Sequence, residues 1–147
     1  MTGPDMTANA PSISQYPLRS HDKLRYADTD RQGHVNNAVF STLLETGRVE
    51  LLYSPDGPLH EVGCSFVIAS LHLDFQGEIH WPGRVEVGTR VASVGRSSLT
   101  LEQALFQDGR CTATATTVIV QVNDGSRRSQ PLGDAALRRL AALRGSP

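Results

Sequence analysis

Between residues 28 and 37 the sequence concentrates side chains that can do chemistry. The stretch reads DTDRQGHVNN and holds two carboxylates, one imidazole and three carboxamides. A connection between two structural elements needs fewer polar groups than this. A carboxylate such as Asp30 can attack a carbonyl carbon, or activate a water molecule that does so. Gly33 allows a tight chain reversal and the close approach of a ligand.

A helix is predicted directly after this stretch, over residues 36–52, where apolar residues recur at steps of three and four. Asn36 or Asn37 can cap its start. The free N–H groups of a helix N-terminus attract a developing oxyanion. A carboxylate beside such N–H groups is typical of an acyl-transfer site. The residues alone leave a second interpretation open, in which Asp30 and the asparagines only cap and turn the chain and His34 is a structural hydrogen-bonding residue.

The elements that must position these residues are one strand, one long helix, and four further strands arranged as a meander. Gly77 is a possible bulge in the second strand, the Trp81–Gly83 stretch suits a type II turn, and Asp108-Gly109 is a strong hairpin signal. This pattern predicts an α+β fold in which the helix lies across an antiparallel sheet. The expected strands span residues 23–28, 64–81, 84–94, 99–106 and 111–122.

A single domain is predicted from the length of 147 residues. We expect a loose tail over residues 1–18, the domain over 19–125, and a second tail over 126–147 that contains a possible short helix. The net charge of −1 argues against a dedicated nucleic-acid binder. The sequence has no apolar stretch near the roughly 18 residues of a membrane span and no signal peptide, which predicts a cytoplasmic protein.

Other reaction types find little support in the sequence. Neither Cys64 nor Cys111 has a second cysteine nearby, so no zinc or redox motif is expected. No histidine pair has the spacing HxxxH or HExxH, and no metal site is predicted. The motifs of serine hydrolases and of nucleotide-binding loops are absent from the sequence. The five histidines are His21, His34, His60, His72 and His80.

The stretch RYADTDRQGHVNNAVFSTLLETGR, residues 25–48, resembles the signature of the hotdog-fold acyl-CoA thioesterases, in the branch of the 4-hydroxybenzoyl-CoA thioesterase. The similarity extends over roughly residues 20–123. Phe40 stands where a tyrosine is more usual. The residues that carry the resemblance are Tyr26, Asp28, Asp30, Gly33, His34, Val35, Asn36, Asn37, Phe40, Glu45 and Arg48.

The resemblance implies a five-stranded antiparallel sheet wrapped around one long helix, in a homodimer or homotetramer with active sites at subunit boundaries. It implies that Asp30 is the catalytic nucleophile or general base, and that the N–H of Asn37 polarises the thioester carbonyl. His34 and Asn36 line the same loop with Gly33. Glu45 is expected in a supporting position, where an ion pair with Arg48 is within reach.

The predicted function is therefore the hydrolysis of an acyl thioester, carried on coenzyme A or on acyl carrier protein, without a cofactor. The polar turn of Arg96, Ser97 and Ser98 could hold a phosphate of coenzyme A, or could be a plain hairpin turn. Two alternatives are a non-catalytic acyl-CoA binder and a hotdog hydratase or dehydratase. The hydratase pattern needs an Asn-Pro between its aspartate and histidine, which is missing here.

Overall fold

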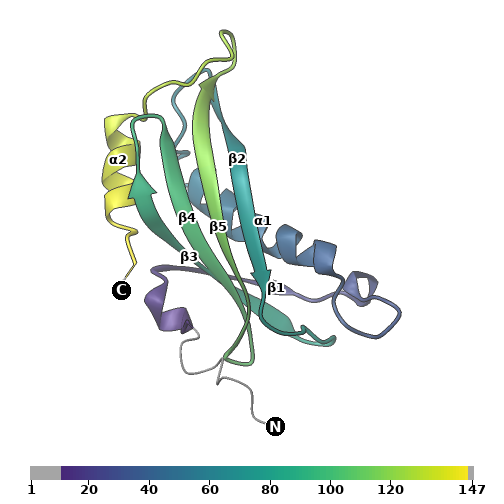
Figure 1. The fold of residues 1–147 in the computed structure, drawn as a ribbon. Helices are drawn as coiled ribbons and strands as arrows, with labels where there is room; N and C mark the ends of the chain where they lie inside the picture. Colours follow the sequence, from purple (N-terminus) through teal and green to yellow (C-terminus); the bar gives the residue numbers. More distant parts are fainter. Residues whose placement is uncertain (1–10, 146–147) are drawn as a thin grey trace.

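The computed structural model describes residues 11–145. Two α-helices and five strands make up most of it, together with two short 3-10 turns (Figure 1). In chain order the elements are η1 Ile13–Gln15, β1 Leu18–Lys23, η2 Tyr26–Asp28, α1 Asn37–Leu52, β2 Cys64–Phe75, β3 Arg84–Val94, β4 Ser98–Gln107, β5 Arg110–Asn123 and α2 Asp134–Ala141.

All five strands form one antiparallel sheet in the order β1-β3-β4-β5-β2. The predicted α+β fold, with a five-stranded antiparallel sheet and one long helix across it, is confirmed, and Figure 1 shows α1 behind the sheet. The simple meander is wrong in one respect, because β2 pairs with β5 and not with its neighbour in sequence, β3. The connection from β2 to β3 therefore crosses the sheet, and β2 becomes an edge strand.

Helix α1 follows the predicted pattern closely. Asn36 is its N-cap, and the side chain of Asn36 accepts a hydrogen bond from the backbone N of Ala38 at 2.9 Å. The predicted apolar stripe is buried against the sheet. Its members are Phe40, Leu43, Leu44, Gly47 and Leu51.

Two predicted strands differ from the observed ones by more than one residue at an end. The first strand lies at 18–23 instead of 23–28, because the chain turns into η2 at Tyr26. The second strand ends at Phe75 and its irregularity lies between Ile68 and Ser70, not at Gly77. Beyond Phe75, the N–H groups of Gln76 and Gly77 still donate to the carbonyl of Thr112 in β5, at 2.9 and 3.1 Å. Residues 79 and 80 pair elsewhere: the N–H of Val35 donates to the carbonyl of Ile79 at 2.8 Å, and His80 forms a bridge with His34.

Two predicted turns have different outcomes, one in the β2–β3 crossover and one in the β4–β5 hairpin. The Trp81–Pro82 peptide is cis and Gly83 has φ of 140°, so this connection is not the expected type II turn. Asp108 and Gly109 both have positive φ, 52° and 79°, as expected of an Asp-Gly hairpin.

Both expected tails contribute buried residues, so the fold extends beyond residues 19–125. Tyr16 is 3% exposed and packs edge-on against Phe106, on the face of the sheet opposite α1. The predicted C-terminal helix is α2, which buries Ala136 and Leu140, and Leu140 lies in a cluster with residues of β3 and α1. The part of the expected N-terminal tail at residues 1–10 lies outside the described residues. None of the helices in the described range is long and apolar enough to cross a membrane.

Candidate active site

The loop between η2 and α1 opens onto a pocket of about 520 Å³. The pocket lies between this loop, the first turn of α1 and the end of β2. Three of the predicted site residues, Asp30, His34 and Asn37, line it. The other lining residues are Gln32, Val35, Phe40, Phe75, Gln76, Gly77 and Glu78.

Local hydrogen bonds fix the position of Asp30 in this loop. Its Oδ1 accepts from the backbone N of Gln32 at 2.8 Å and from the backbone N of His34 at 3.2 Å. The N–H of Gly33, with φ of 82°, donates to the carbonyl of Asp30 and closes the turn. Within residues 11–145, nothing donates a hydrogen bond to the other carboxylate oxygen, Oδ2. One oxygen of Asp30 is therefore held by the turn while the other remains available.

Asn36 and Asn37 have different roles at the start of α1. Both polar groups of Asn36 take part in local structure: its side chain caps the helix, and its N–H donates to the carbonyl of Asp28 at 2.8 Å. The N–H of Asn37 has no acceptor in the described part of the chain. It carries the partial positive charge of a helix N-terminus into the wall of the pocket. An available carboxylate and an available N–H thus line the same pocket.

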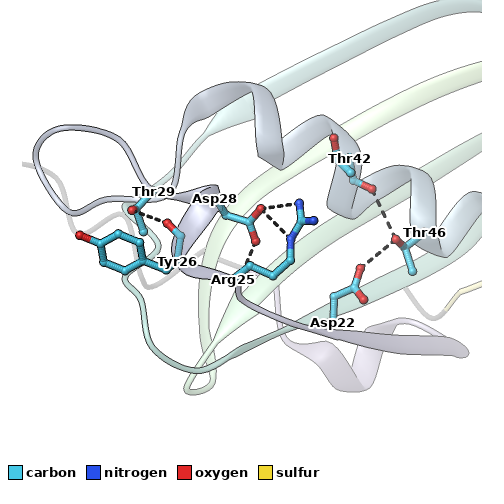
Figure 2. Close-up of polar contacts among 7 residues, drawn as sticks. All are labelled: Asp22, Arg25, Tyr26, Asp28, Thr29, Thr42 and Thr46. Atoms are coloured by element: carbon cyan, nitrogen blue, oxygen red, sulfur yellow. Dashed lines mark hydrogen bonds and ion pairs between the residues drawn. The ribbon is translucent and has the colours of Figure 1, made fainter.

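Asp28, a buried carboxylate, lies where η2 ends and the loop begins, and Figure 2 shows it beside Arg25. It accepts from the Arg25 guanidinium at 2.8 Å and from the Arg25 backbone N at 2.8 Å. The Arg25 hydrogen bonds hold the pKa of the Asp28 carboxyl below its usual range. The hydroxyl of Thr46 donates to Asp22 at 2.9 Å and so ties β1 to α1, as Figure 2 also shows.

The remaining predicted residues lie outside the pocket. Glu45 is exposed on α1. The expected Glu45–Arg48 ion pair does not form, because Arg48 turns into the core and donates to Gln103 Oε1 at 3.4 Å. Burial lowers the pKa of the Arg48 guanidinium.

The polar turn of Arg96, Ser97 and Ser98 connects β3 to β4. It lies at the far end of β3 from the pocket, and β3 is 11 residues long, which is about 33 Å of extended chain. A single chain therefore does not bring this turn to Asp30.

Sequence reasoning missed two polar residues beside the pocket, Glu78 and His80. The imidazole Nε2 of His34 lies 3.3 Å from Glu78 Oε2, and Nε2 of His80 lies 3.4 Å from the same oxygen. The sequence pattern places 78–80 at the end of a long strand. No sequence signal points to the pairing of these residues with the loop that carries Asp30.

Comparisons with known proteins show the family and the fold of this chain. The model of the thioesterase-like superfamily matches residues 24–140. A search among curated proteins found no match.

Several solved structures are similar over most of this chain. A thioesterase from Thermus thermophilus, solved in complex with coenzyme A and Zn, is 36% identical, with a TM-score of 0.76 over 90% of this chain and 98% of its own. A protein from Pseudomonas aeruginosa strain PAO1 is 29% identical, with a TM-score of 0.83 over 92% and 97%. A predicted thioesterase from Bacillus stearothermophilus is 26% identical, with a TM-score of 0.78 over 88% and 98%. The chain belongs to the thioesterase-like superfamily and has its hotdog fold.

Proposed function

We propose that this protein is an acyl-CoA thioesterase, which hydrolyses an acyl thioester to a free acid and coenzyme A. Water adds to the carbonyl carbon, the carbon–sulfur bond breaks, and the thiolate leaves and takes up a proton. Asp30 supplies the reacting carboxylate. It either attacks the carbonyl carbon, giving a mixed anhydride that water then hydrolyses, or it activates the water directly.

The observation that carries this proposal is the placing of Asp30 and the Asn37 N–H in one pocket. A thioester carbonyl oxygen that accepts from the Asn37 N–H would develop its negative charge at the N-terminus of α1. Phe40 and Phe75, whose rings are 5.0 Å apart, give the pocket an apolar wall suited to an acyl group. His34 is a further polar group beside the reacting atoms.

Coenzyme A is the proposed carrier because a similar thioesterase, from Thermus thermophilus, was solved with coenzyme A. Acyl carrier protein is the alternative carrier. The cytoplasmic location also remains a prediction.

A phosphate role for the turn of Arg96, Ser97 and Ser98 requires a second copy of the chain. If two β2 edges pair antiparallel, the far end of one sheet lies beside the pocket end of the other. That arrangement would bring this turn of one subunit toward Asp30 of its neighbour, where the Arg96 guanidinium suits a phosphate.

The test is thiol release from a panel of short, medium, long and aromatic acyl-CoAs by the wild type and by Asp30→Asn. The substitution keeps the size of the side chain and removes its basicity. We expect kcat to fall by at least about two orders of magnitude, the loss typical of removing a general base. Asp108→Asn is the matched control, because Asp108 is exposed in a hairpin turn where φ of 52° suits asparagine equally well.

Two outcomes would overturn the proposal. If Asp30→Asn were as active as the wild type, Asp30 would be only a turn residue. If the wild type hydrolysed neither the acyl-CoA panel nor acyl carrier protein thioesters, the protein would be a non-catalytic binder.

A further inference from the structure

Three side chains beside the pocket, those of His34, Glu78 and His80, bring possible metal-ligand atoms close together. The His34 and His80 Nε2 atoms flank Glu78 Oε2 at 3.3 and 3.4 Å, and the three donor atoms lie within 4.8 Å of one another. The two imidazole rings are nearly perpendicular, with their centroids 4.9 Å apart. No Lys or Arg side chain among the described residues forms an ion pair with Glu78.

The backbone produces this convergence. His34 and His80 are directly opposite each other in an antiparallel bridge, so their side chains leave the two segments side by side. Glu78 lies two residues before His80, and residues two apart in extended chain share a face. One face of a single two-stranded bridge therefore presents two imidazoles and a carboxylate.

The distances suit a metal ion. Bonds of about 2.0–2.1 Å to nitrogen and oxygen ligands in a tetrahedral site place neighbouring ligand atoms about 3.3–3.4 Å apart. The two contacts of Glu78 already have this length. The two imidazole nitrogens lie within 4.8 Å of each other, and rotation of these partly exposed side chains can set their spacing to the same value.

We propose that His34, Glu78 and His80 bind one divalent transition-metal ion of the zinc type at the edge of the substrate pocket. Two imidazoles and one carboxylate are a ligand set for zinc, and three protein ligands leave a fourth position for water or another small ligand. Mg²⁺ prefers six oxygen ligands and is not expected to bind there. The site goes beyond the proposed thioesterase activity and does not depend on it.

A metal ion here would join the loop that carries Asp30 to the segment that follows β2. The backbone already links them through the bridge of His34 and His80 and the hydrogen bond from Val35 to Ile79. The metal would add side-chain bonds to these backbone contacts, and it would stabilise the loop against local opening. Binding of the ion to the folded chain alone also raises the free energy of unfolding.

The experiment is a titration of the untagged full chain with Co²⁺, followed by visible absorption, and with Zn²⁺, followed by calorimetry, without any substrate. We expect one ion per chain, a tetrahedral Co²⁺ spectrum and a rise in Tm with Zn²⁺. The variants His80→Ala and Glu78→Gln should each weaken binding at least about tenfold, the smallest loss usual even for residues that only support metal ligands. Mg²⁺ should leave the Tm unchanged.

His72→Ala is the matched control, because His72 and Asp74 also form a contact of 3.0 Å but offer only two donor atoms. It should bind Co²⁺ as the wild type does. The proposal is overturned if the wild type binds no stoichiometric Co²⁺ or Zn²⁺, or if His72→Ala weakens binding as much as His80→Ala does. It is also overturned if Glu78→Gln, a substitution that preserves size, binds the ion unchanged.

Discussion

The two aspartates of the Asp-x-Asp motif differ in their surroundings. Asp28 is 5% exposed, and both of its carboxylate oxygens accept hydrogen bonds from Arg25. Asp30 is exposed in the pocket and keeps one oxygen available. The first aspartate is therefore engaged in the fold of the loop, whereas the second has the oxygen that the proposed reaction needs.

Asp28→Asn should lower the free energy of unfolding at pH 7 by about 1–3 kcal/mol, because charge-assisted hydrogen bonds to a buried group are lost. The pKa of Asp28 is lower in the folded state than in the unfolded state. Its contribution is therefore complete above the pKa of an ordinary aspartate, about 4, and disappears as the pH falls through the lowered value. Urea unfolding of both proteins from pH 7 down to pH 3 measures this difference.

Arg25→Met is the companion variant for that series, because it removes the guanidinium but keeps the backbone N–H bond to Asp28. At pH 7 its free energy of unfolding should fall by less than that of Asp28→Asn. The difference from the wild type should depend on pH in the same way. A gap between wild type and Asp28→Asn that stayed constant down to pH 3 would contradict the assigned role of Asp28.

At the scale of the elements, the sequence predicts those helices and strands that have a clear local periodicity. The helix over 37–52 and the strands after Gly83 could be predicted, because each has a clear period and clear turn residues at its ends. The end of β2 could not. Residues 76–80 continue the apolar alternation of β2, but residues 79 and 80 pair with residues 35 and 34 and not with β5.

The same contrast between local pattern and tertiary pairing explains which site residues could be predicted and which were missed. Asp30, His34 and Asn37 are close in sequence, and a helix start brings such residues together by itself. Glu78 and His80 reach them through a tertiary contact that leaves no local pattern. The order of the strands could not be predicted for the same reason, since nothing in the sequence of β2 shows that it pairs with β5.

Gly47 shows how tertiary packing can override helix propensity. A Cβ there would lie 2.8 Å from each of three side-chain atoms, on Val87, Thr89 and Gln103. The Gln103 amide cannot move freely, since its Nε2 donates to the Leu44 carbonyl at 3.0 Å and to Thr89 at 3.0 Å. The close approach of α1 to the sheet therefore depends on the absence of a side chain at this position.

Gly47→Ala should destabilise the protein by about 1–2 kcal/mol, although alanine favours an isolated helix by about 1 kcal/mol. Overpacking of a tight core typically costs about 1–3 kcal/mol, more than the gain. Thermal and urea unfolding measure the change. Gly77→Ala is the control, because no heavy atom would lie within 4 Å of its new Cβ in the described structure. A stabilised Gly47→Ala would show that α1 can move away from the sheet at little cost.

At the scale of the whole molecule, the edge of β2 stands out. Ile68, Leu71 and Phe75 are 50%, 40% and 51% exposed, and the outer side of β2 has no strand beside it within the described part of this chain. Monomeric proteins usually protect such an edge with charges, prolines or a covering segment. An apolar edge strand of 12 residues therefore fits the expected dimer, in which two β2 strands pair and two sheets become one.

The double variant Ile68→Lys/Leu71→Lys should convert an oligomer into monomers, because charges on an edge strand oppose pairing with a second edge. Light scattering after gel filtration measures the mass, and we expect the wild type to have twice the mass of one chain or a multiple of that. Leu137→Lys is the control: Leu137 is 38% exposed but lies on α2, which packs near β3, away from the β2 edge (Figure 1).

If the pocket is completed by a second subunit, the monomeric variant should also lose thioesterase activity while remaining folded by circular dichroism. A wild type that runs as a monomer and still hydrolyses acyl-CoA would show instead that one chain contains the whole site.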